Sequence, residues 1–393
     1  MLKLDHITAG FTAVVVGYTS AIILVIQAAQ GLGANAVQVE SWLLALGIGM
    51  GLTSVGLSYF YKIPILIAWS TPGAALLISL EGQYSLAQAI PAFVVTGLLI
   101  SLTALVKPLN KALSSIPSSL SSAMLAAILL PFCVDAFTPA SSRPEAFAAM
   151  FFTFIAAKLL FPKFAMLILL IVGVGVALAI GEFSLMDMSL SAVEPAWMGW
   201  QWNNSAIVNI ALPLYIITML SQNLPGFAML KNYDYAPPNK SILLSTGFVT
   251  SLLAPIGAFS INLAAITAAI CMNENVDERH DKRYLASMSA GVMYVLAGIW
   301  GSAVVSLFLA LPKEVSMMLA GLALLSTLAL CLKKSLTEGD IEPALLTFLV
   351  TLSGVSIGGI NSTLLGLLVG LGYMVLIQRR SAMHQTKPLK QLK

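Results

Sequence analysis

The sequence predicts an all-α polytopic membrane protein in which fourteen transmembrane segments form two inverted repeats of seven. Three observations indicate this fold class: the composition, the distribution of basic residues, and a pattern that recurs after about half of the chain. Of 393 residues, 58% are hydrophobic and 9% are charged, with a mean hydropathy of +0.91, whereas soluble domains carry about 25% charged residues. Because a spanning helix needs about 20 apolar residues, the chain has room for about fourteen spans and no sizeable soluble domain.

Hydropathy and loop composition place the individual segments. The first apolar stretch, 7–29, exceeds the roughly 7 to 15 residues of a signal-peptide core, so we expect it to remain as the first span. The first repeat covers 1–200, the second covers 201–380, and 381–393 form a basic cytoplasmic tail that we expect to be disordered from Arg379 onward. The predicted segments lie near 7–29, 41–60, 64–80, 86–106, 117–136, 144–161, 163–181, 205–223, 240–255, 256–272, 284–310, 313–331, 341–359 and 362–378.

The basic residues test this number of segments, because a missed span would invert every later loop. With a cytoplasmic N-terminus, only Arg143 and Lys313 of the 20 lysines and arginines fall on the outer side. Fourteen segments with both termini in the cytoplasm therefore satisfy the positive-inside rule. We expect a multi-pass protein of the inner (plasma) membrane of a bacterium, in contact with the lipid bilayer.

Two short patterns recur in the two halves of the chain. The stretch "AWSTPGAAL", 68–76, resembles "AFSINLAAI", 258–266, and "PSSLSSAMLAAILL" from Pro117 resembles "PKEVSMMLAGLALL" from Pro312. Seven segments is an odd number, so the second copy must lie upside down relative to the first. Inverted repeats of this kind characterise secondary transporters, whose substrate site lies near the bilayer midplane.

The first recurring pattern predicts a helix that begins in mid-membrane. Thr71 can serve as an N-cap and Pro72 suits the first helical position. A second helix start is expected near Ser260, at the same depth from the opposite side. Each start exposes unpaired N–H groups and about half a positive charge, a pair of features that favours an anion or a polar planar ring. A kink in a continuous packed helix is the alternative.

Aromatic and polar side chains near the two helix starts are candidates for substrate contact. Trp69 and Phe259 each precede a serine and could stack on an aromatic ring, although large aromatic residues more often pack the interior. Gln222 and Asn223 lie near the end of the eighth segment, where the alternative is a helix end at the water interface. The predicted substrate-binding residues are Tyr18, Trp69, Ser70, Thr71, Gln222, Asn223, Phe259, Ser260 and Asn262.

Other functional classes find little support in the sequence. The three cysteines and three histidines show no metal-ligand spacing, so we expect no metal, no disulfide and no cofactor. An intramembrane enzyme is disfavoured because the chain lacks an HExxH motif, paired intramembrane aspartates and a Ser/His pair at depth. No catalytic residue is predicted. The basic residues are explained by topology, so no nucleic-acid partner is expected.

The segments "AWSTPGAALL", "LPLYIITMLSQNLPG" and "GAFSINLAAITAAI" together resemble the benzoate/proton symporter (BenE) family of bacteria. The resemblance covers the whole chain. It implies the seven-plus-seven fold of uracil permease, with segments 1–4 and 8–11 as a core domain and segments 5–7 and 12–14 as a gate domain. It also implies short strands before half-helices in segments 3 and 10, which would hold the substrate.

The resemblance implies proton-coupled import of benzoate or a similar aromatic carboxylate by alternating access. The nucleobase relatives carry carboxylates in segments 8 and 10, but here Gln222, Phe259 and Ser260 occupy the equivalent positions, which favours an anionic substrate. The proton could travel on the substrate, through water, or through Asp5, Glu40 or Glu274, each more simply an interface charge. Another substrate on the same fold (a nucleobase, another organic anion, or an exported metabolite), an anion exchanger and a channel stay open, as does the oligomeric state, including a homodimer.

Overall fold

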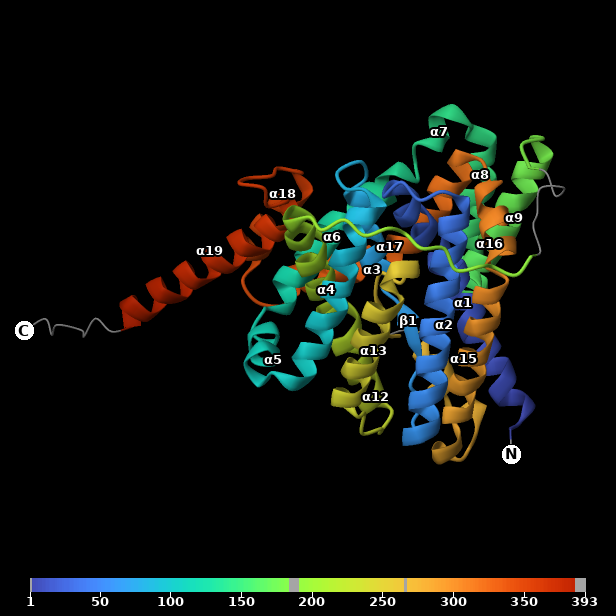
Figure 1. Ribbon diagram of the computed structural model, residues 1–393. Coiled ribbons are helices and arrows are strands. Elements are labelled where there is room, and N and C mark those ends of the chain that lie inside the picture. The colour runs from blue at the N-terminus through green and yellow to red at the C-terminus, as the bar shows by residue number, and fades with distance from the viewer. Residues whose placement is uncertain (1, 184–190, 265–266, 386–393) are drawn as a thin grey trace, which may run out of the picture.

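A computed structural model describes residues 2–183, 191–264 and 267–385, which are mostly helical (Figure 1). In the first half, a short strand and a short helix take the place of the third continuous span. The elements are α1 (Leu4–Gly31), α2 (Ala36–Tyr61), β1 (Ile67–Trp69), α3 (Thr71–Ser79), α4 (Leu86–Leu105), α5 (Lys107–Ser114), α6 (Ser118–Asp135), α7 (Pro139–Ser142), α8 (Pro144–Leu160) and α9 (Ala165–Ala179).

The second half repeats this order. Its eighth segment is one long helix, 204–232, made of α10 (Asn204–Ala206), η2 (Ile207–Ala211), α11 (Leu212–Thr218), η3 (Met219–Asn223) and α12 (Leu224–Asn232), in which η2 and η3 are π-helical turns. The remaining elements are α13 (Asn239–Leu253), η4 (Ala254–Ile256), β2 (Ile261–Leu263), α14 (Ala268–Met272), η5 (Glu274–Val276), η6 (His280–Lys282), α15 (Tyr284–Ile299), α16 (Gly301–Leu309), α17 (Lys313–Thr337), α18 (Ile341–Leu352) and α19 (Ser362–Gln385).

The predicted fourteen-segment architecture is confirmed, with segments of unequal length. Within the described residues, seven helices are long and apolar enough to cross a membrane alone, and an eighth crossing is formed by 280–299 and α16, which meet at a bend of 64°. The other segments are shorter helices or the strand-and-helix breaks. In Figure 1 the N-terminus, α5 and α12 lie toward one end of the molecule and α7 toward the other, as alternating loops require.

Helices of the two repeats pack between one another. Helix α2 lies against α15 and α4 lies against α13, while α6 packs on α17 in a separate contact. Glycines allow the first approach: a Cβ at Gly47 would lie 2.6 Å from the carbonyl oxygen of Tyr294, and one at Gly298 would lie 3.1 Å from Gly47 Cα. Small residues of this kind let membrane helices come close. The two strands are held in the middle of this interleaved group.

The strands β1 and β2 form an antiparallel pair, with Ile67 opposite Leu263, Ala68 opposite Asn262 and Trp69 opposite Ile261. Both strands are almost wholly buried. Unpaired strand edges at membrane depth would expose polar backbone groups, so pairing across the two repeats is the physical solution. It fixes the two breaks at one depth.

Two boundary predictions need correction. The eighth segment does not end at Asn223 but continues to Asn232, so Gln222 and Asn223 lie inside this helix and not at its end. The last helix continues through Gln385, so Arg379 and Arg380 are helical and not part of a disordered tail. Residues 386–393 lie outside the described residues.

Candidate functional site

The first break begins with a capped helix. Ser70 has an extended backbone, and its Oγ accepts a hydrogen bond from the Gly73 N–H at 3.1 Å. The cap is therefore Ser70, and the prediction that Thr71 caps the helix is wrong: Thr71 is already the first helical residue. Serine suits the position because its short side chain reaches back to the third helical N–H.

This cap uses most of the donors that we expected to be free at α3. Pro72 has no N–H, the Gly73 N–H is bonded to Ser70 Oγ, and the Ala74 N–H donates to the Ser70 carbonyl oxygen at 2.8 Å. Thr71, which is half-buried, supplies the remaining donor of this turn. The positive end of the α3 dipole persists at this point, but a ligand would meet one N–H group and not four.

The second break is built differently. Ser260 lies before β2 and not at the start of a helix, and α14 begins at Ala268. Residues 265 and 266 lie outside the described residues. The equivalent strands are 194 residues apart, whereas the motif comparison aligned Ser70 with Ser260 at 190. The prediction of equivalent serines at two helix starts is therefore wrong, because the strand pairing, and not the serine, defines the repeat.

Ser70 and Ser260 nevertheless lie side by side across the strand pair. The Ser70 N–H donates to the Ser260 carbonyl oxygen at 3.3 Å. Between their side chains lies the Thr218 hydroxyl of α11, 2.9 Å from Ser260 Oγ and 3.3 Å from Ser70 Oγ. All three side chains are fully buried. Sequence reasoning missed Thr218, whose only signal is a hydroxyl in an apolar stretch of the eighth segment.

The two predicted asparagines hold the strands. Asn223 Oδ1 accepts a hydrogen bond from the Leu263 N–H at 3.0 Å. The Asn262 amide, oriented so that both of its polar atoms are satisfied, accepts from the Ser70 N–H at 3.0 Å and donates to the Leu263 carbonyl oxygen at 2.9 Å. Both side chains are fully buried. Gln222, on the same π-helical turn as Asn223, is only half-buried.

The predicted aromatic residues separate into two groups. Trp69 lies edge-on against Tyr18, with ring centroids 4.8 Å apart, and Tyr18 stacks on Tyr294 of α15 at 5.9 Å. The Tyr18 hydroxyl is buried and has no hydrogen-bond partner among the described residues, an arrangement that is costly without a ligand or water. Sequence reasoning missed Tyr294, because nothing in its apolar segment marks it.

Phe259 belongs to the other aromatic group. It is fully buried between Trp42, at 5.5 Å in a stacked arrangement, and Phe93, at 6.3 Å edge-on. Gly257, with φ +115°, precedes it, and a side chain there would collide with the Trp42 ring. The position is thus a packed core, and the structure gives Phe259 a packing role away from Tyr18.

Comparison with known proteins decides the family. The family model described as benzoate membrane transport protein (BenE) matches residues 1–376. The chain belongs to the BenE family of membrane transporters. It is 38% identical over 370 residues to the inner membrane protein YdcO of Escherichia coli, covering 94% of this chain and 95% of that one. It is 34% identical over 382 residues to the benzoate membrane transport protein of Acinetobacter baylyi, covering 97% of each.

Solved structures support the fold of this BenE family member. The transmembrane domain of the cyanobacterial bicarbonate transporter BicA superposes with a TM-score of 0.65 at 14% identity, over 93% of this chain and 97% of that one. SLC26A9 gives 0.66 at 13% identity, over 95% of this chain and 65% of the other. These proteins share the fold. Family and fold agree on a transporter and not an enzyme.

Carboxylates are absent from the centre of this BenE protein, within the described ranges. Glu40 is half-buried near the start of α2, whereas Asp5 and Glu274 are exposed. Among the described residues the one buried carboxylate is Asp277, whose Oδ2 contacts Lys3 Nζ at 2.9 Å and His6 Nε2 at 3.0 Å near the start of α1. The Lys3 hydrogen bond, helped by the Arg279 N–H, lowers the pKa of Asp277 to about 2. No cluster of three or more metal-ligating side chains occurs anywhere among the described residues.

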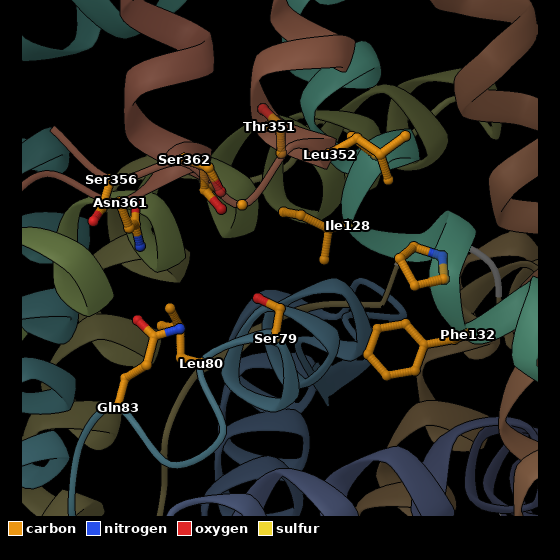
Figure 2. A pocket seen from close by; sticks show the side chains of 14 residues that line it. Ser79, Leu80, Gln83, Ile128, Phe132, Thr351, Leu352, Ser356, Asn361 and Ser362 are labelled. Carbon is orange, nitrogen blue, oxygen red and sulfur yellow. The ribbon is translucent and has the colours of Figure 1, made fainter.

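Two cavities lie between elements predicted to belong to the core and the gate. Figure 2 shows the first, about 420 Å³, with Ser79 of α3 and Gln83 below, Asn361 above, and Phe132 of α6 at the right. The second, about 570 Å³, lies at the opposite, N-terminal end of α6, against α12. The two cavities thus lie near opposite ends of α6.

Proposed function

We propose that this BenE transporter imports benzoate or a similar aromatic carboxylate together with protons, by alternating access of a core domain against a gate domain. One observation carries the proposal: the positive end of α3 lies beside the rings of Trp69 and Tyr18, in a centre without carboxylates among the described residues. A carboxylate fits the first feature and an aromatic ring fits the second.

In the proposed binding mode, the substrate carboxylate accepts hydrogen bonds from the Thr71 N–H and hydroxyl at the α3 terminus. The ring lies against Trp69 and Tyr18, whose unpartnered hydroxyl turns toward the substrate or a bridging water. Gln222 supplies an amide from the eighth segment. Ser70, Ser260, Asn223 and Asn262 hold the strands and the helix start, and Phe259 packs the core behind them.

Proton coupling follows from charge. An aromatic acid with a pKa near that of glutamate, about 4.3, is an anion at pH 7. Import of a lone anion would work against about 2.3 kcal/mol per 100 mV of inside-negative potential. One proton per anion removes this electrical cost. Because the described mid-membrane segments hold no carboxylate, the proton travels on the substrate, through water, or through a peripheral acid.

The decisive experiment is uptake of labelled benzoate into proteoliposomes, with the pH gradient and the membrane potential imposed separately. Symport predicts uptake that responds to an inward proton gradient at zero potential. Uptake that ignores the gradient and requires an internal anion would replace symport by exchange, and large single-molecule currents would indicate a channel. Competition by benzoate, salicylate and uracil separates an aromatic-acid carrier from a nucleobase carrier on the same fold.

A further inference from the structure

The second cavity is amphipathic. One wall comes from the eighth segment and is largely apolar, with Leu220, Leu224 and Met229. The other wall comes from the start of α6 and from α17, and it carries Ser118, Ser121 and Lys334 among its polar groups. We call this space the Lys334 vestibule. At about 570 Å³ it exceeds the volume of a single-ring carboxylate, whose two ends differ in the same way as the two walls.

The polar wall favours an anion. Lys334 is half-buried and forms no ion pair among the described residues. The residue at the N-cap of α6 is Pro117, which offers no side-chain cap, so the first N–H groups of this 18-residue helix lack the cover that Ser70 gives α3. A cation beside an uncapped helix start gives two positive features on one wall.

One acidic group lies close to this wall. Glu338, one turn after Lys334, accepts a hydrogen bond from Ser118 Oγ at 2.5 Å. It does not line the cavity and is not within ion-pair distance of Lys334. The Glu338 carboxylate is thus bonded to a hydroxyl of the polar wall, while Lys334 lines the vestibule without an ion pair among the described residues.

The vestibule lies beside the turn of the eighth segment that carries Gln222. Leu220 and Leu224 flank Gln222, two residues away on either side, on the same turns of the eighth segment. The end of the molecule on which it lies carries the N-terminus and α5, and it is the predicted cytoplasmic face (Figure 1). Gln222 itself does not line the vestibule.

We propose that the Lys334 vestibule is a second, cytoplasmic binding site for the aromatic carboxylate, with the carboxylate on Lys334 and the α6 start and the ring on the eighth segment. The inference rests on the proposed function for the identity of the ligand. It assigns Lys334 a role in substrate capture and release on one side of the membrane only. Such a site shortens the path over which a desolvated anion is without a countercharge.

Transport measured from each side tests this role. In inside-out vesicles, Lys334→Gln raises the benzoate concentration for half-maximal uptake about fivefold, the effect expected of one half-buried ion pair. Uptake from the outer side keeps its wild-type KM. Lys334→Arg keeps near-wild-type values on both sides and shows that the fold is intact. The matched control is Lys333→Gln, because Lys333 is exposed and does not line the vestibule.

Labelling gives a direct readout of occupancy. Ser121→Cys places a thiol in the vestibule, whereas the three native cysteines are buried. A membrane-impermeant thiol reagent modifies this variant in inside-out vesicles and leaves the wild type unreacted, and benzoate slows the modification. In the Lys334→Gln background this protection is lost.

Equal half-saturation concentrations for Lys334→Gln and Lys333→Gln in inside-out vesicles overturn the vestibule site. So does a rate of thiol modification of Ser121→Cys that benzoate does not change, when the wild type transports benzoate. A wild-type protein that does not transport benzoate instead contradicts the proposed function. The two failures are therefore distinguishable.

Discussion

The two broken transmembrane segments differ in which end of their short helix is fixed by a side chain. Helix α3 has nine residues, starts directly after its strand, and is capped at its N-terminus by Ser70. Helix α14 has five residues, starts five positions after Leu263, and has no side-chain cap at Thr267. Its other end is held instead, because Arg283 Nη1 donates to the Met272 carbonyl oxygen at 3.1 Å.

This difference shows that an inverted repeat need not give a symmetric site. The strands are equivalent and paired, but among the described residues only the first break places a helix N-terminus directly beside them. The substrate carboxylate is therefore expected on the α3 side, and the second break serves to position the strands. The predictions below test this asymmetry, from the largest expected effect to the smallest.

The largest effect is expected at the α3 start. Gly73→Val places a branched side chain where a Cβ alone would lie 2.8 Å from Ser70 Oγ and 2.5 Å from Leu214 Cδ1. Overpacking of this kind costs about 1–3 kcal/mol and displaces the cap, so benzoate uptake should fall at least about tenfold. The control is Gly56→Val, because a Cβ at Gly56 meets nothing within 4 Å. Equal uptake by both variants would contradict the assignment of α3.

Substitutions of Asn223 and Gln222, on the same π-helical turn, should affect different quantities: the first the stability of the fold, the second the KM for benzoate. Asn223→Ala leaves the Leu263 N–H buried without its partner, at a cost of about 1–3 kcal/mol in the free energy of unfolding. Gln222→Ala should leave thermal stability unchanged and raise the KM for benzoate. Thermal unfolding in detergent and uptake kinetics measure the two quantities. The opposite pattern would exchange the roles of the two residues.

The two serines compare the breaks directly. Ser70→Ala removes the α3 cap, worth about 1 kcal/mol, and should raise the uptake KM about fivefold. Ser260→Ala removes a hydroxyl bonded to Thr218 but no cap, so its KM should stay within about twofold of wild type. If both substitutions raise KM equally, the two breaks contribute equally and the asymmetry is refuted.

The smallest effect concerns the loop after α14. Asp277 has a pKa lowered from 3.8 to about 2, chiefly by Lys3, so its stabilising interactions are complete above pH 3.8 and are lost as pH falls toward 2. Asp277→Asn should lower the melting temperature by about 2–4 °C at pH 7. Its difference from wild type should shrink between pH 4 and pH 2.

The control for this last prediction is Asp281→Asn. Asp281 pairs with Arg279, and both side chains are more than half exposed, so the loss of their ion pair should be almost silent. A difference between Asp277→Asn and wild type that persists undiminished near pH 2 would show that the carboxylate charge is not what holds the N-terminus to this loop.

Sequence reasoning located the segments well because hydropathy and loop charge are local properties. The predicted 86–106 and 117–136 match α4 and α6 within about two residues, and a break after Trp69 was expected from the Ser-Thr-Pro-Gly stretch. The cap was misplaced by one residue because serine and threonine have nearly equal capping ability. The backbone of Ser70, extended by its strand, made the choice.

Contacts between distant segments were beyond sequence reasoning. The alignment of Ser70 with Ser260 rested on a shared residue type, but strand pairing shifted the true equivalence by four positions. Thr218 and Tyr294 escaped notice because each is a single polar or aromatic residue in an apolar helix. Thr218 gains its neighbour from the packing of α11 beside Ser260, and Tyr294 gains its neighbour from the packing of α15 against α1.

By itself the sequence determined a transporter-like membrane protein of fourteen segments, the inverted repeat and the position of the first break, since each is written in composition, periodicity or local turn chemistry. The tertiary structure alone decided which hydroxyl caps α3, which asparagines bond the strands, and which aromatic rings meet. Hydrogen bonds and ring contacts depend on distances of a few ångströms between residues far apart in the chain, and those distances are fixed only when the two repeats pack together.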